Sequence, residues 1–99
     1  MTRKAQRSSG NVFRDLGFPR EEAANLRIRA ELMVRLRRLI EARGLTQADA
    51  AELFKVSQPR VSDLLRGKIE LFSIDTLVIM LARAGVQVSV VARPRSNVA

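Results

Sequence analysis

Hydrophobic residues recur every three or four positions between residues 20 and 43, and charged residues fill most positions between them. This spacing places the hydrophobic side chains on one face of a helix. Pro19 before the segment and Gly44 after it are typical of a helix start and a helix end. We therefore predict a long helix over residues 20–43, with a buried face made by Leu32, Met33, Leu36, Leu39 and Ile40.

Two shorter helices are predicted next, over residues 47–54 and 57–66. Thr46 and Ser57 are typical N-cap residues, and Gly67 is expected to end the second helix. The second helix has two different faces. Its hydrophobic face contains Val61 and Leu64, and its opposite face carries hydrogen-bonding side chains, namely Gln58, Arg60, Ser62, Asp63 and Arg66. Such a helix suits the major groove of B-DNA; the alternative is a helical hairpin whose polar face is merely solvated.

The C-terminal third predicts one more helix and one strand. Ser73 is a good N-cap for a helix over residues 74–84, and Ile79 and Met80 add hydrophobic surface to it, which hints at a subunit interface. Residues 86–92 alternate in a way that is typical of a β-strand. Because no second convincing strand follows from the sequence, we expect this strand to pair with its copy in a second subunit. Pairing with residues 11–18 is the alternative.

The chain is expected to form one domain over residues 11–93, between disordered tails at residues 1–10 and 94–99. Residues 11–18 are too short for an independent helix. They contain two of the four phenylalanines, Phe13 and Phe18. We expect a turn-like segment that docks on the helices or on a partner.

Charge and composition narrow the function. The net charge is +8, with 15 Arg against 3 Lys, which favours an anionic partner and suits phosphate and guanine contacts. No hydrophobic run is long enough to span a membrane, so we expect a soluble cytoplasmic protein without a membrane partner. The chain has no His, Cys or Tyr and no plausible catalytic constellation. We therefore expect no enzyme, no catalytic residue, no metal and no cofactor.

Residues 45–68 resemble the helix-turn-helix of the XRE family, the Cro and phage-repressor type of DNA-binding protein. The matching positions are Leu45-Thr46-Gln47, Ala51, Val56-Ser57-Gln58, Val61, Leu64 and Arg66-Gly67-Lys68. One position departs from the family, because Lys55 stands in the turn where the family has Gly; a left-handed Lys55 would cost about 1 kcal/mol. The resemblance implies an all-α, four- to five-helix Cro/repressor-like domain. The C-terminal β-strand predicted above, which we expect to pair across a dimer, would extend this domain.

The resemblance also implies a DNA-binding site. Its members are Gln47, Ser57, Gln58, Arg60, Ser62, Asp63, Arg66 and Lys68. Gln47 and Ser57 would contact phosphate or orient their neighbours, and Arg66 and Lys68 would bind phosphate. Gln58 would read a base edge, ideally that of adenine, and Arg60 would reach guanine or a flanking phosphate. Asp63 would line the groove with Ser62 and accept from cytosine, unless it forms a salt bridge to Arg60 or Arg66.

Residues 9–93 further resemble small HigA-type antitoxins, which implies two roles. One is homodimeric binding of double-stranded DNA at a palindromic operator of the protein's own promoter. The other is neutralisation of a ribonuclease toxin of the RelE/HigB kind. Such toxins are usually basic, and the acidic residues here are scattered. The main interpretation is therefore a sequence-specific transcriptional regulator, an autorepressor with its recognition helix at residues 57–66. The alternative is the antitoxin.

Overall fold

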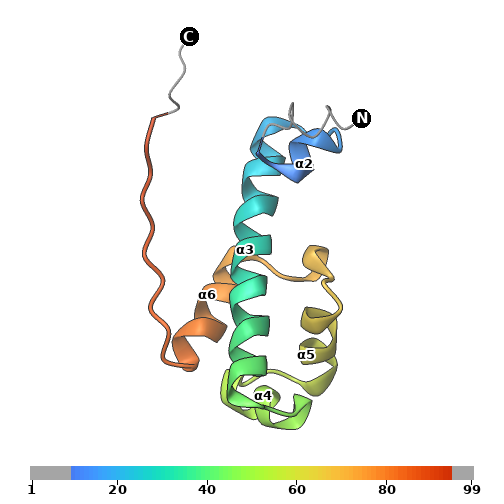
Figure 1. Ribbon diagram of the computed structural model, residues 1–99, viewed down its shortest axis with the longest axis vertical. Helices are drawn as coiled ribbons and strands as arrows, with labels where there is room; N and C mark the ends of the chain where they lie inside the picture. Colours follow the sequence, from blue (N-terminus) through green and yellow to red (C-terminus); the bar gives the residue numbers. More distant parts are fainter. Residues whose placement is uncertain (1–9, 95–99) are drawn as a thin grey trace.

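Five α-helices and a 3₁₀ helix are present in residues 10–94, the part of the chain that the computed structural model describes (Figure 1). In chain order they are α2 (Val12–Asp15), α3 (Arg20–Arg43), α4 (Gln47–Phe54), α5 (Gln58–Leu65), η1 (Ile69–Leu71) and α6 (Ile74–Arg83). The predicted all-helical class and the number of helices are confirmed for these residues. The predicted tails lie largely outside them, at residues 1–9 and 95–99.

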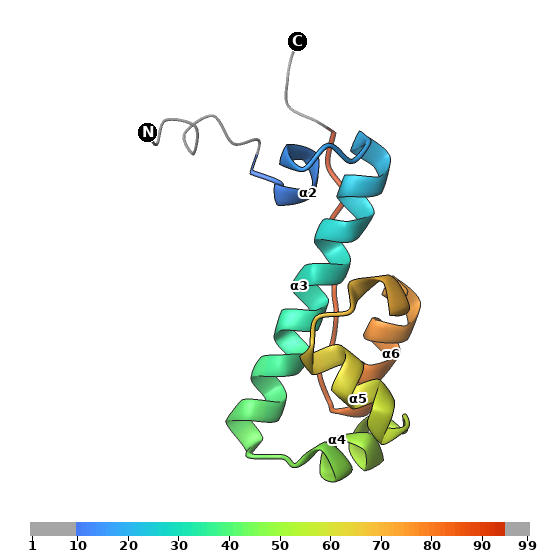
Figure 2. The same ribbon diagram turned by 90° about the vertical axis from the view of Figure 1, so that its right-hand side faces the viewer.

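The long helix α3 is the axis of the molecule. It carries α2 at one end and α4 at the other, as the two views in Figures 1 and 2 show. Both of its ends are where the sequence predicts them, and Gly44 closes it in a left-handed conformation with φ 61°. None of the helices in the described part of the chain is long and hydrophobic enough to cross a membrane.

The core lies where α3, α4, α5 and α6 meet. Its largest fully buried side chains include Phe54, Phe72, Leu36 and Leu77. Met80 is also fully buried, so the prediction that it adds outward-facing surface is wrong. The reason is that α6 packs against both α3 and α4, which covers two of its sides. Ile79, on a third side, stays 49% exposed as expected.

Several arginines tie helices together by donating to backbone carbonyl oxygens. The last carbonyls of a helix have no partner inside it, so such donors satisfy groups that would otherwise need water. The pairs are Arg29 to Ile69 and Phe72 (3.2 and 3.3 Å), Arg37 to Leu65 (2.6 Å), Arg43 to Ala84 (3.1 Å) and Arg83 to Phe54 (2.9 Å). Part of the arginine excess therefore serves the fold itself.

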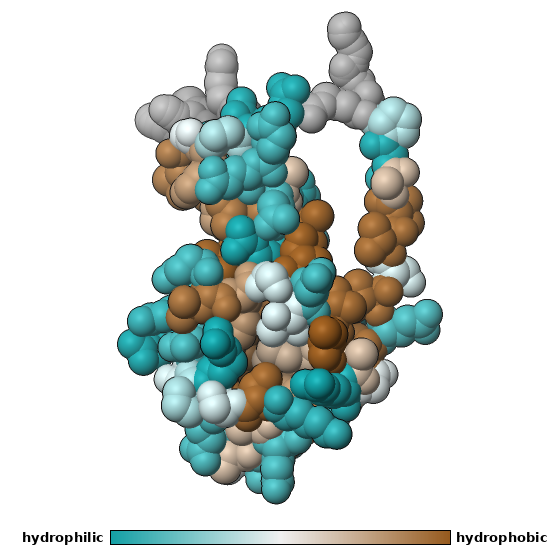
Figure 3. All heavy atoms as spheres, turned by 180° about the vertical axis from the view of Figure 1, so that it is seen from behind, coloured by the Kyte–Doolittle hydropathy of each residue, from teal (hydrophilic) through white to brown (hydrophobic). Residues whose placement is uncertain are grey.

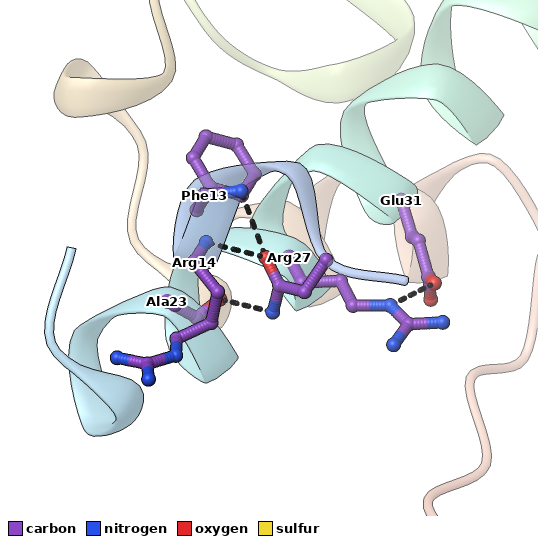
Figure 4. Close-up of polar contacts among 6 residues, drawn as sticks. Phe13, Arg14, Ala23, Arg27 and Glu31 are labelled. Carbon is purple, nitrogen blue, oxygen red and sulfur yellow. Dashed lines mark hydrogen bonds and ion pairs between the residues drawn. The ribbon is translucent and has the colours of Figure 1, made fainter. Parts of the chain in front are cut away.

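Residues 11–18 form a single helical turn, α2, and a loop that dock on α3. Asn11 accepts hydrogen bonds from the backbone N–H groups of Phe13 and Arg14, and its amide donates to the carbonyl of Ala23 at 3.1 Å (Figure 4). The rings of Phe13 and Phe18 meet edge to face, with centroids 6.1 Å apart. The expected docking on the helices is seen. The backbone is helical at residues 12–15 because Asn11 caps it.

The predicted β-strand over residues 86–92 is not a strand in the single chain. After α6 the chain runs in an extended course along α3 towards the end that carries α2 (Figures 1 and 2). A strand needs a neighbour to pair its backbone groups, and residues 11–18, the alternative partner, are occupied in α2 and its loop. Val86 and Val88 pack against the core, whereas Val90 and Val91 are 84% and 72% exposed. Figure 3 shows the segment after α6 standing apart from the rest of the molecule, with hydrophobic atoms along it.

Candidate nucleic-acid interface

Local side-chain bonds set the start of both helices in the predicted DNA-binding unit. The Thr46 hydroxyl accepts from the backbone N–H of Asp49 at 3.0 Å, and the Asp49 carboxylate accepts from the N–H of Thr46 at 3.3 Å. This is a reciprocal capping box. Ser57 caps α5 by accepting from the N–H of Arg60 at 3.3 Å. Both predicted N-caps are thereby confirmed, and the Thr-x-x-Asp spacing could have predicted the role of Asp49 as well.

The turn between α4 and α5 depends on Lys55. Its φ and ψ are 59° and 49°, which is a left-handed conformation. No other non-glycine residue in the described part of the chain has a positive φ. Its N–H and that of Val56 both donate to the carbonyl of Ala51. The chain therefore makes the tight turn without the glycine of the family, as the sequence predicts.

The back of this unit is buried and its front is open. Ala51 is 9% exposed where α4 meets α5, and Val61 and Leu64 on α5 are buried in the core. The first turn of α5 presents Gln58 and Pro59 to solvent. Because its hydrophobic face is fully used in packing, α5 can offer its polar face to another molecule without losing core contacts.

The predicted site residues divide by exposure. Those that are well exposed are Gln47, Ser57, Gln58 and Arg66, and those that are half-buried are Arg60, Ser62, Asp63 and Lys68. Gln47, Ser57 and Gln58 lie at the starts of the two helices, whereas Arg66 and Lys68 lie beyond the end of α5. The structure thus brings six of these residues onto α5 and its two caps, with Gln47 on α4 and Lys68 just after the α5 C-cap.

Arg60 is the member that points elsewhere. Its guanidinium donates to the carbonyl of Leu71 at 2.9 Å and lies 5.4 Å from the ring centroid of Phe72. These contacts tie α5 to η1, a role that sequence spacing does not predict. Asp63 has no ion pair with Arg60 or Arg66, because the sole ion pair among residues 10–94 joins Arg27 and Glu31 on α3 (Figure 4).

A shallow hollow of about 590 Å³ lies between α4 and α5 beside Gln58. Glu52 and Lys55 also line it, and both are exposed. Neither was among the predicted site residues. Glu52 lies in the last turn of α4 and Lys55 is the C-cap of that helix, so both come next to the first turn of α5. Lys55 adds a positive charge near the start of the candidate recognition helix.

The comparisons with known proteins agree with this geometry. Residues 12–93 match a family model described as "Helix-turn-helix domain". A solved structure titled "Putative XRE Family Transcriptional Regulator" has 34% sequence identity and a TM-score of 0.72, over 79% of this chain and 90% of that one. None of the curated proteins compared with the chain gives a significant match.

Proposed function

Since this chain belongs to the helix-turn-helix domain family, and within it to the XRE family, we propose that it is a sequence-specific, double-stranded DNA-binding transcriptional regulator. The membership confirms the resemblance found in residues 45–68. The observation that supports the proposal most is the exposed polar first turn of α5 on a helix whose other face is buried. This turn can enter a major groove as a rigid element.

Gln58 is proposed to read a base. It is exposed at the first position of α5, and its amide can donate to and accept from adenine at the same time. Ser57 and Gln47, at the starts of α5 and α4, are placed to contact the phosphates that flank such a base. Arg66 and Lys68 would hold phosphates beyond the end of α5.

The test is binding of a labelled duplex that covers the DNA upstream of the protein's own gene, followed by fluorescence anisotropy. Gln58→Ala should weaken this binding by about 5- to 150-fold, the equivalent of ~1–3 kcal/mol for a bidentate base contact, and leave binding to a scrambled duplex nearly unchanged. The matched control is Asn25→Ala, because Asn25 is also an exposed carboxamide but lies on α3, outside both α5 and the segment after α6. Equal losses in the two variants would refute the assignment of α5.

We further propose that the protein acts as a homodimer on a palindromic operator. The support is the C-terminal segment, where Val90 and Val91 are exposed on an extended backbone with no partner strand in the described part of the chain. Antiparallel pairing with a second copy would satisfy the backbone N–H and C=O groups of this segment, place its valines beside those of the partner, and relate two α5 helices by a two-fold axis. Two half-sites about one helical turn apart would then be read together. Binding at its own promoter would exclude polymerase, which makes the protein an autorepressor.

An antitoxin role is the second candidate. The observation that favours it is on α2, where Val12 and Leu16 are 60% and 70% exposed and lie four positions apart, on one side of the turn. Exposed hydrophobic residues that share a face suit a protein partner. If a ribonuclease of the RelE/HigB kind binds here, the double change Val12→Asp and Leu16→Asp should abolish the complex on size-exclusion chromatography. An unchanged complex would place the toxin elsewhere.

A further inference from the structure

A hydrophobic hollow of about 290 Å³ lies where α2, α3 and the C-terminal end of α5 meet. Figure 1 shows α2 and α5 on the same side of α3. Residues of all three helices line the hollow. Its wall is made mainly by Phe13 of α2, Ala30 and Met33 of α3, Leu64 of α5, and Ile69 of η1. Its volume is close to the lower end of the range for small-molecule sites.

Arg37 adds a positive charge to this hydrophobic wall. One of its N–H groups donates to the carbonyl of Leu65, and a guanidinium has five N–H donors. No carboxylate in residues 10–94 lies within ion-pair distance of it. A hydrophobic hollow with an uncompensated guanidinium on its wall suits a ligand that has a hydrophobic body and an anionic head, because the charge would fix the ligand's orientation.

We propose that this hollow is an effector site for a small carboxylate with an aromatic or alkyl body. A cavity of ~150 Å³ holds a benzene molecule, so a hollow of about 290 Å³ accommodates on the order of twelve non-hydrogen atoms. The carboxylate pairs with Arg37, and the body packs on Phe13, Ala30 and Ile69, the partly exposed side chains of the wall, next to Met33 and Leu64.

The site touches the candidate recognition helix from behind. Leu64 belongs to α5, and Gly67, which also lines the hollow, follows its C-cap. Arg37 is bonded to the carbonyl of the last residue of α5, next to Arg66. A bound carboxylate would neutralise this charge beside the DNA-binding surface. We therefore expect the bound ligand to lower the affinity of the protein for DNA. This regulatory part of the inference rests on the proposed function.

The first experiment measures ligand binding alone, by calorimetry and by NMR of side-chain methyl groups. The probe is 2-naphthoate, and 2-naphthylmethanol is its neutral match. We expect 2-naphthoate to bind at least tenfold more tightly and to shift the methyl signals of Met33, Leu64 and Ile69. Arg37→Gln should remove the difference between the probes. Equal affinity of both probes for the wild-type chain, or shifts confined to other residues, would overturn the proposal.

A second variant, Ala30→Leu, fills the hollow and keeps Arg37. Ala30 is half-buried and central in α3, and leucine is a good helix former. This variant should lose binding of both probes while its helical circular dichroism stays unchanged. If it binds 2-naphthoate as the wild-type chain does, the ligand is not in this hollow. A melting curve confirms that the variant is folded.

The effect on DNA is measured separately. Without probe, the wild-type chain must bind the upstream duplex, and failure here would refute the DNA function but not the ligand site. With saturating 2-naphthoate we expect a loss of about two- to tenfold in DNA affinity, close to the contribution of one phosphate contact at physiological salt. Ala30→Leu should show no such loss. An unchanged DNA affinity of the wild-type chain with bound probe would overturn the regulatory role.

Discussion

At the scale of single residues, the same side-chain type serves different purposes at neighbouring positions. Arg60 and Arg66 both follow the start of α5. Arg60 is held by the carbonyl of Leu71 and the ring of Phe72, whereas Arg66 is exposed, and its guanidinium bonds to no other residue in the described part of the chain. Their substitution should therefore separate stability from DNA affinity.

Arg60→Ala should lower the free energy of unfolding by about 1–2 kcal/mol, because a hydrogen bond and a cation–π contact are lost. Arg66→Ala should change it by less than about 0.5 kcal/mol, as expected for an exposed surface position. Urea unfolding measures both. For DNA, Arg66→Ala should reduce the slope of log affinity against log salt by about one. If Arg66→Ala destabilises the fold as much as Arg60→Ala, the assigned roles are wrong.

Lys55 stores backbone strain in the turn between α4 and α5. Its φ of 59° is a conformation that glycine adopts freely. Lys55→Gly should therefore stabilise the chain by about 0.5–1 kcal/mol. Lys68→Gly is the control, since Lys68 has a φ of −77° and gains nothing from glycine. Thermal melting compares the stability of the two variants. If Lys55→Gly is less stable than the wild-type chain, Lys55 is not strained in this turn.

At the scale of elements, the sequence predicts what is determined locally. The ends of α3, the caps Thr46 and Ser57, and the turn at Lys55 all depend on residues a few positions apart, and they are seen as predicted. The left-handed conformation of Lys55, which the sequence leaves open, is the one that the turn adopts. The contact between Arg60 and Leu71 and the burial of Met80 depend on how distant segments meet, which periodicity does not encode. The same holds for the wall of the hollow that joins α2 to α5. In the candidate site, the exposure of the residues at the helix starts could be predicted from the sequence. The contacts that hold Arg60 against η1 could not.

The extended segment after α6 is an element that requires a partner to become a strand. Val90→Pro removes a backbone donor and should weaken a strand-paired dimer by more than tenfold, whereas Val90→Ala keeps the donor and should weaken it less. Val90 is 84% exposed in the single chain, so neither change disturbs packing within it. Analytical ultracentrifugation measures the dimer. If the Val90→Pro variant remains a dimer, the protein dimerises through another surface and the strand pairing is wrong.

At the scale of the whole molecule, the positive charge is divided between the domain and its ends. Residues 10–94 contain fourteen Lys and Arg against ten Asp and Glu, so half of the net charge of +8 belongs to residues 1–9 and 95–99. Within the domain, several guanidiniums are bonded to carbonyl oxygens. Net charge therefore explains non-specific attraction to DNA better than it explains selection of a site.

The most direct test of the central claim is the ratio of affinities of the wild-type chain for its own upstream duplex and for a scrambled duplex, at two salt concentrations. A recognition helix that reads bases gives a ratio of at least ~10³ that is kept when salt is raised, although both affinities fall. If the two duplexes bind with equal affinity, and both affinities fall equally as salt is raised, charge alone holds the DNA, and α5 is not a recognition helix.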